Sequence, residues 1–121
     1  MKLIDFIFLI FLFNVQIKLI KTSSKLKYIG CYADNSITKD LNLFSLVSLN
    51  MTIDLCGEFC TNRTTRFIGL QNQSQCYCSN SFGTYGIAPS DQQCNLTCIG
   101  NSSTICGGIN YNSVYATKHG L

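Results

Sequence analysis

Residues 52–78 read TIDLCGEFCTNRTTRFIGLQNQSQCYC, and this stretch decides the fold because it holds four of the eight cysteines. Its first part, residues 52–60, predicts a short helix. Thr52 can cap the N-terminus, and Asp54 lies in the first turn, where the helix dipole favours a negative charge. Cys56 and Cys60 recur at helical spacing and therefore share one face. A helix this short is marginal alone, so other parts of the chain must hold it.

The second part of the stretch predicts a β-hairpin. Residues 66–70 (RFIGL) and 75–78 (QCYC) form its strands, with residues 72–74 at the tip. Side chains alternate along a strand, so Cys76 and Cys78 point to one face and Tyr77 points to the other. Two cysteine pairs on facing elements predict a helix that is bridged twice to a strand.

Outside this stretch, residues 28–32 and 112–116 predict two strands that pair with each other. Residues 41–49 alternate imperfectly and indicate a half-buried loop or a short strand. Residues 80–108 are rich in turn-forming residues and predict a loop region held by Cys94, Cys98 and Cys106. The expected fold class is α+β: a small, loop-rich, disulfide-rich domain with one short helix packed on a small antiparallel sheet.

The N-terminus predicts a signal peptide over residues 1–23. Lys2 precedes an apolar run at residues 6–13 (FIFLIFLF), and small residues at 22–24 offer a cleavage site. An uncleaved membrane anchor is the alternative. The apolar run is too short to span a membrane, so we expect no membrane-spanning segment after cleavage. Residues 24–121 then form a single domain, with a core over about residues 27–116.

Export to an extracellular compartment agrees with two further features. The even number of cysteines predicts four disulfides in an oxidising compartment. Five N-glycosylation sequons occur, at Asn50, Asn62, Asn72, Asn95 and Asn101. Removing the leader lowers the formal net charge from +3 to +1, which leaves too little positive charge for a nucleic-acid-binding face.

Catalysis and metal binding are both disfavoured by the residues present. The single histidine, His119, lies in a C-terminal tail that we expect to be mobile, whereas a nucleophilic site needs its histidine held. Asp54 and Glu58 lie one helical turn apart, and we interpret them as a solvated helix surface. Cysteines at these spacings can bind zinc, but behind a signal peptide they predict disulfides. We therefore expect no enzyme, no metal and no cofactor.

What remains is a binding surface. Sugars are commonly held by an aromatic ring against their C–H face, with amides and carboxylates on their hydroxyl groups. Tyr77 is the leading candidate, because its cysteine neighbours anchor the strand while its ring faces the other side; packing of Tyr77 under a loop is the alternative. The other candidate binding residues are Gln75, Asn80, Phe82, Tyr85 and Asp91, with Gln71, Gln73 and Tyr111 nearby.

The cysteine spacing as a whole resembles the WSC domain. The pattern runs Gly30-Cys31-Tyr32, Cys56-x3-Cys60, Cys76-x-Cys78, Cys94-x3-Cys98 and Cys106-Gly107-Gly108, and it covers residues 27–116. The resemblance implies an extracellular module that is similar in fold to PAN/apple-type domains and binds carbohydrate. Family members often have tryptophan between the C-x-C cysteines, where this chain has Tyr77. Wall-sensor members carry a Ser/Thr-rich stalk and a transmembrane helix, which this sequence does not show.

About a hundred disulfide pairings are possible with eight cysteines. The shared faces favour bridges from the helix to the strand. We expect Cys60 to pair with Cys76 and Cys56 with Cys78, and for the remaining four we expect Cys31–Cys106 and Cys94–Cys98. The predicted function is a secreted, non-catalytic module that binds a polysaccharide or a glycoprotein glycan. The alternative is an extracellular protein-interaction module of the receptor-ectodomain kind.

Overall fold

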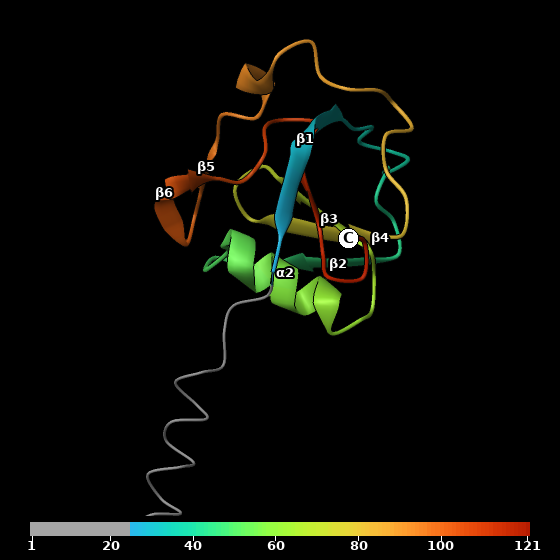
Figure 1. The fold of residues 1–121 in the computed structure, drawn as a ribbon. Helices are drawn as coiled ribbons and strands as arrows, with labels where there is room; N and C mark the ends of the chain where they lie inside the picture. Colours follow the sequence, from blue (N-terminus) through green and yellow to red (C-terminus); the bar gives the residue numbers. More distant parts are fainter. Residues whose placement is uncertain (1–24) are drawn as a thin grey trace, which may run out of the picture.

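The computed structural model describes residues 25–121, and the expected signal peptide at residues 1–23 lies outside them. Figure 1 shows one α-helix under a curved antiparallel sheet, with a small hairpin at one end. The elements in chain order are β1 (Lys27–Ala33), β2 (Phe44–Val47), α2 (Ile53–Thr61), β3 (Phe67–Gln71), β4 (Gln75–Ser79), the 3-10 helix η1 (Asp91–Gln93), β5 (Thr97–Cys98), β6 (Asn101–Ile105) and β7 (Tyr111–Ala116).

Five of the strands form one sheet in the order β1-β7-β3-β4-β2, and every neighbouring pair is antiparallel. Strands β5 and β6 form a separate two-stranded hairpin. The expected pairing of residues 28–32 with 112–116 is confirmed, and residues 41–49 contain a short edge strand, β2. The expected fold class of a small disulfide-rich α+β domain is confirmed.

Helix α2 begins where the sequence places its cap. The Thr52 hydroxyl accepts a hydrogen bond from the Leu55 N–H at 3.0 Å, which satisfies one backbone donor of the first turn. The helix buries Cys56 and Cys60 against β3 and β4, and Gly57 is buried against Leu26. The core between helix and sheet is completed by a set of fully or almost fully buried residues: Met51, Ile68, Leu70, Cys76, Cys78, Cys98 and Cys106.

The helix is bridged twice to β4, as expected, but all four expected pairings are wrong. The disulfides are Cys31–Cys94, Cys56–Cys76, Cys60–Cys78 and Cys98–Cys106. The expected Cys60–Cys76 and Cys56–Cys78 pairs would require α2 and β4 to run in opposite directions. A short connection turns the chain back from α2 into β3, and the hairpin turns it again into β4. Helix and strand therefore run the same way, so their first cysteines pair together and their second cysteines pair together.

The sheet face opposite the helix is covered by two loops, residues 34–43 and 80–90. Phe82 packs edge-on against Tyr32 and Phe67, with ring centroids 5.0 and 4.7 Å apart. The buried Asp40 carboxylate joins the two loops, because it accepts hydrogen bonds from the backbone N–H groups of Gly83 at 2.7 Å and Thr84 at 3.2 Å. These contacts fix the loops over the sheet and shape the surface around Tyr77.

Residues 94–108 contain structure that the sequence did not predict, namely the hairpin β5–β6 closed by Cys98–Cys106. The turn that follows depends on Gly107, which has φ +76°. A Cβ atom there would lie 2.1 Å from the Leu70 carbonyl oxygen, so any side chain would force the two segments apart. The Cys-Gly-Gly motif is therefore a packing requirement of the β3–β4 hairpin.

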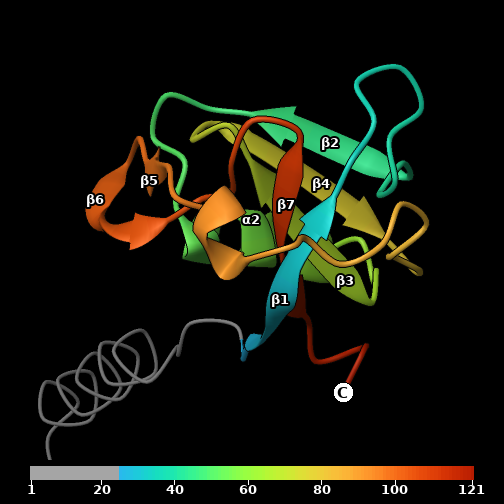
Figure 2. The ribbon, with the colours of Figure 1, turned by 90° about the horizontal axis from the view of Figure 1, so that it is seen from above.

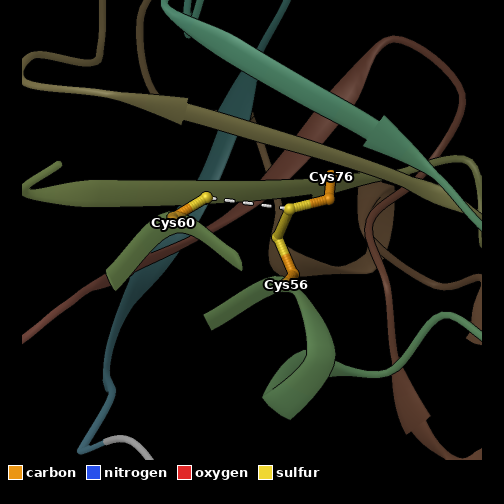
Figure 3. Close-up of side chains that lie close together, drawn as sticks. All are labelled: Cys56, Cys60 and Cys76. Carbon is orange, nitrogen blue, oxygen red and sulfur yellow. Dashed lines mark hydrogen bonds between the residues drawn. A yellow bond between two sulfur atoms is a disulfide. The ribbon is translucent and has the colours of Figure 1, made fainter. Parts of the chain in front are cut away.

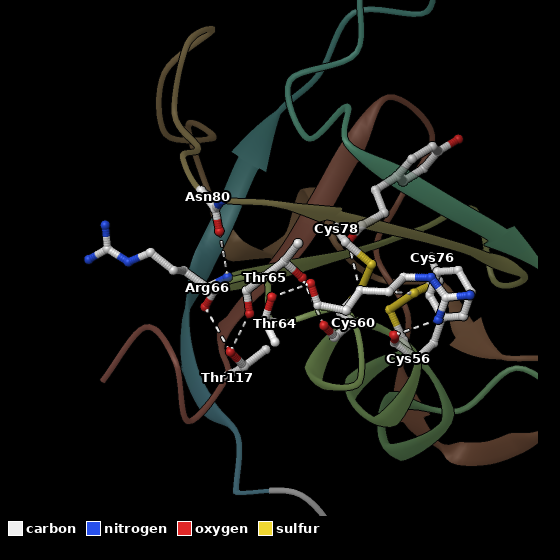
Figure 4. The surroundings of a disulfide bond; sticks show 12 residues. Cys56, Cys60, Thr64, Thr65, Arg66, Cys76, Cys78, Asn80 and Thr117 are labelled. Atoms are coloured by element: carbon white, nitrogen blue, oxygen red, sulfur yellow. Dashed lines mark hydrogen bonds between the residues drawn. A yellow bond between two sulfur atoms is a disulfide. The ribbon is translucent and has the colours of Figure 1, made fainter.

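The C-terminal tail folds back on the chain, whereas we expected it to be mobile. Thr117 is fully buried, and its hydroxyl donates to the Thr65 carbonyl at 2.6 Å (Figure 4). The Thr117 N–H donates to the Arg66 carbonyl at 2.9 Å. An imidazole nitrogen of His119 lies 3.2 Å from the Thr61 carbonyl oxygen. The tail thus closes over the segment between α2 and β3.

Candidate functional site

A shallow hollow of about 220 Å³ lies beside Tyr77, on the sheet face opposite α2. It arises from the alternation along β4: Cys76 and Cys78 are fully buried toward the helix, and Tyr77 between them is directed to the other face, where it is half-buried. Loop 34–43 and β2 supply the rest of the wall. The hollow is lined by Lys39, Leu41, Asn42, Leu43, Phe44, Ser45 and Tyr77.

The Tyr77 ring is held in place by polar contacts at its hydroxyl and above its face. Its hydroxyl donates to Gln75 Oε1 at 3.1 Å. The Lys39 ammonium nitrogen lies 5.1 Å from the ring centroid, which is within cation–π range. The same nitrogen donates to Gln71 Oε1 at 3.2 Å. Because Gln71 is buried, these contacts join the rim of the hollow to the sheet beneath it.

The charge that the hollow exposes is positive. Lys39 forms an ion pair with Asp34 at 3.4 Å, yet the Asp34 side chain is only 1% exposed, against 27% for Lys39. The other Asp34 carboxylate oxygen accepts hydrogen bonds from the Asn35 and Asp40 N–H groups, each at 2.8 Å. The ammonium group is therefore the member of the pair that faces solvent, while the Asp34 carboxylate is buried.

Of the candidate residues from the sequence, the structure brings Tyr77, Gln75 and Gln71 together and separates the others from them. Asn80 lies at the far end of β4, where its Oδ1 accepts from the Arg66 N–H at 3.0 Å (Figure 4). Phe82 is committed to packing against Tyr32 and Phe67.

The remaining candidates lie in loops and at the edge of the sheet. The Tyr85 hydroxyl donates to the Thr38 carbonyl at 2.6 Å, which ties the two covering loops together. Gln73 is exposed in the hairpin turn, and Tyr111 packs against the buried Cys31–Cys94 pair. Asp91, in η1, lies near Tyr28 of β1 and does not line the hollow.

The negative charge of Asp91 affects the pKa of a tyrosine outside the hollow. Burial, followed by the negative charge of Asp91, raises the pKa of the Tyr28 hydroxyl. Burial alone raises the pKa of Tyr115, whose ring meets that of Tyr28 edge-on with centroids 5.1 Å apart. The Tyr28–Tyr115 pair is therefore a second aromatic group, on a strand pair remote from β4 in the sheet order.

Sequence reasoning missed six residues of the hollow: Lys39, Leu41, Asn42, Leu43, Phe44 and Ser45. Two of these follow from the register, because Ser45 pairs with Tyr77 and Phe44 with Cys78 across β2 and β4. A signal for them existed in the imperfect alternation of residues 41–49. No local pattern indicates Lys39 or Asn42, because a loop that crosses the sheet brings them there.

Three cysteine sulfur atoms, from Cys56, Cys60 and Cys76, lie within 4.8 Å of one another (Figure 3). Cys60 Sγ and Cys76 Sγ are 3.7 Å apart, and since both belong to disulfides neither carries a proton, so this is a packing contact. Zinc binds cysteine as the thiolate. These sulfur atoms are in disulfides and are not thiolates, so the cluster is part of the hydrophobic core.

The five sequon asparagines, Asn50, Asn62, Asn72, Asn95 and Asn101, are all exposed. No helix within residues 25–121 has the length and apolar character that crossing a bilayer requires.

Comparison with known proteins agrees with this cysteine framework. The chain is 34% identical over 82 residues to Kremen protein 1 of Homo sapiens, which covers 66% of this chain and 17% of that protein. Two WSC domain-containing proteins of Arthroderma benhamiae are 33% identical over 78 residues and 30% identical over 92 residues, covering 64% and 74% of this chain but 11% and 10% of those proteins.

The chain thus spans less than a fifth of the length of each of these relatives. A profile of the WSC domain matches residues 28–108, from β1 to the Gly107-Gly108 turn, which includes all eight disulfide-bonded cysteines. The chain belongs to the WSC domain family.

Proposed function

We propose that this domain is a secreted, non-catalytic module that binds carbohydrate in the hollow beside Tyr77. The observation that carries the proposal is the composition of that hollow. An aromatic ring lies next to an ammonium group, an amide and a hydroxyl, supplied by Lys39, Asn42 and Ser45. A ring can contact the C–H face of a sugar, and the polar groups can contact its hydroxyl groups.

The size of the hollow supports recognition of one unit of a longer chain. About 220 Å³ is less than the roughly 300–1,000 Å³ of pockets that enclose drug-sized ligands. The hollow can take a single sugar ring, while neighbouring units of the polymer lie outside it. Binding of one unit at a time is weak, so we expect affinity to increase when several domains meet one polysaccharide.

The rigidity of the site supports the same proposal. Tyr77 lies between two disulfide-bonded cysteines, and Lys39 is held by Asp34 and Gln71 before any ligand arrives. A binding surface that is already ordered loses little conformational entropy when it binds. This matters most for a shallow site with few contacts.

The test is binding of the oxidised domain, with its own N-glycans in place, to a panel of polysaccharides and glycoprotein glycans. We expect saturable binding that Tyr77→Ala abolishes and Tyr77→Phe retains in part, because Phe keeps the ring and loses the hydroxyl contact to Gln75. The matched control is Tyr28→Ala, which removes an exposed tyrosine outside the hollow. Equal loss in the Tyr28 and Tyr77 variants would contradict a site at Tyr77.

A second candidate function is docking of a protein partner, as in a receptor ectodomain. The observation that favours it is the exposed apolar surface at the start of the edge strand β2, where Phe44 is 44% exposed and Leu43, just before the strand, is 50% exposed. The segment of Kremen protein 1 that aligns with this chain amounts to 17% of that protein. Protein docking predicts binding that soluble glycans do not compete away and that Phe44→Ser weakens more than Tyr77→Phe does.

A further inference from the structure

One end of the domain exposes three large aliphatic side chains. Val47 is 68% exposed, Leu49 79% and Ile99 47%. We call these three residues the apolar end. Val47 closes β2, Leu49 follows it, and Ile99 lies in the turn between β5 and β6.

The three residues lie on segments that are in direct contact. The Ser48 N–H donates to the Ser74 carbonyl, the Ile99 N–H to the Gln73 carbonyl and the Gly100 N–H to the Met51 carbonyl, at 3.0, 3.2 and 2.8 Å. Figures 1 and 2 agree, because both show the end of β2, the β3–β4 turn and the β5–β6 hairpin on the same side of the molecule. The three residues therefore lie on neighbouring segments at one end of the domain, and exposed apolar residues gathered in this way need a covering group more than scattered ones do.

The strand beneath it is protected as a sheet edge only by its short length of four residues. β2 reads FSLV and contains no charge and no proline, while the opposite edge strand, β1, begins at Lys27. An edge that is both apolar and uncharged favours pairing with another chain. Something other than its own side chains must prevent that.

Three of the five sequons surround this surface. Asn50 directly follows Leu49, Asn101 comes two residues after Ile99, and Asn72 is next to Gln73, whose carbonyl bonds Ile99. All three asparagines are exposed. At Asn101 the Ser103 hydroxyl donates to Oδ1 at 2.7 Å, so the side chain is ordered and its amide nitrogen stays free.

We propose that N-linked glycans on Asn50, Asn72 and Asn101 cover the apolar end and keep the domain monomeric. In each case the asparagine Nδ2 forms a bond to C1 of an oligosaccharide, the bond from that carbon to the pyrophosphate of a lipid carrier breaks, and the nitrogen loses one proton. The proposal requires passage through a secretory pathway, in agreement with the four disulfides.

The arrangement also separates this surface from the hollow. Phe44, which lines the hollow, begins β2 and Leu43 precedes it, whereas Val47 ends β2 and Leu49 follows it. The two remaining sequons are placed elsewhere, with Asn62 at the C-terminal cap of α2 and Asn95 just after η1. The proposed cover thus lies at one end of the domain, and its test needs no ligand at Tyr77.

The experiment compares two glycan-deficient variants of the chain secreted from a eukaryotic host. The test variant is Asn50→Gln, Asn72→Gln and Asn101→Gln combined, and the matched control is Asn62→Gln with Asn95→Gln. Intact mass counts the glycans, sedimentation velocity measures the oligomeric state, and fluorescence of a dye that binds apolar surface reports exposure. We expect the sedimenting mass of the test variant to double or rise further, with increased dye fluorescence, while the control stays monomeric.

A third variant identifies the surface responsible. In the test background, Val47→Lys, Leu49→Lys and Ile99→Lys should restore the monomer, since they place charge on the apolar end. If the test variant is not secreted, trimming the folded wild-type glycans to one sugar per site takes its place. The proposal is overturned if the test variant or the trimmed chain remains monomeric with unchanged fluorescence. It is also overturned if the wild type is monomeric but carries no glycans at these three sites, or if the test variant still associates after the lysine substitutions.

Discussion

Removing the Cys31–Cys94 disulfide should destabilise the domain more than removing Cys98–Cys106, because the first closes a much longer loop. The pairs are 63 and 8 residues apart in sequence. The Cys56–Cys76 bridge shortens the first loop to about 43 residues, and chain entropy then gives about 4 kcal/mol for Cys31–Cys94 against about 2.6 kcal/mol for Cys98–Cys106. The difference of about 1.4 kcal/mol corresponds to roughly a tenfold difference in the unfolding equilibrium.

The assay is urea unfolding of two double variants, Cys31→Ala with Cys94→Ala and Cys98→Ala with Cys106→Ala. Each keeps six cysteines, and mass analysis after alkylation should show all six oxidised. Both pairs are almost fully buried, so each variant loses similar packing and the contrast isolates loop length. Equal free energies of unfolding, or a larger loss for the Cys98–Cys106 variant, would refute the loop-length argument.

Three further predictions concern the cap, the tail and a tyrosine. Thr52→Ala should lower the free energy of unfolding by about 1 kcal/mol in the same assay, with Thr52→Ser close to wild type, because the cap accepts a helix N–H. Thr117→Val should cost about 1–3 kcal/mol, since it keeps the shape but leaves the buried Thr65 carbonyl without its 2.6 Å partner; a neutral result would contradict the tail contact. Burial and the charge of Asp91 raise the pKa of the Tyr28 hydroxyl above 10.0, so the protonated hydroxyl stabilises the fold at neutral pH, and this contribution is lost as the pH rises through the folded pKa. Phenolate absorbance should show a tyrosine that ionises at a higher pH than a free tyrosine does, and Tyr28→Phe should remove that tyrosine from the titration curve.

The elements of this fold follow from local sequence patterns. The cap at Thr52, the helical spacing of Cys56 and Cys60 and the alternation around Tyr77 each depend on residues within a few positions, and all three are confirmed. Loop geometry also constrains the helix-to-strand pairing. Counting the two chain reversals between α2 and β4 makes these elements parallel and pairs Cys56 with Cys76.

Other features depend on contacts between segments far apart in sequence. Cys31 pairs with Cys94 because η1 packs beside β1, and no spacing rule predicts this contact from the sequence. The residues of the candidate site fall into the same two groups. Tyr77 and Gln75 share a strand face and were predictable together, whereas Lys39 reaches the hollow through a loop fixed by Asp34 and Asp40.

The hollow beside Tyr77 has two walls of different origin. The β4 wall is covalently fastened to α2 through Cys76 and Cys78, so it belongs to the part of the domain that hydrogen exchange should find slowest. The loop wall, with Lys39 and Asn42, contains no cysteine and is held by hydrogen bonds and aromatic packing. Covalent bonds fix the position of the first wall, whereas noncovalent contacts order the second. Substitutions in residues 34–43 can therefore change which ligand fits while the disulfide framework continues to specify the fold.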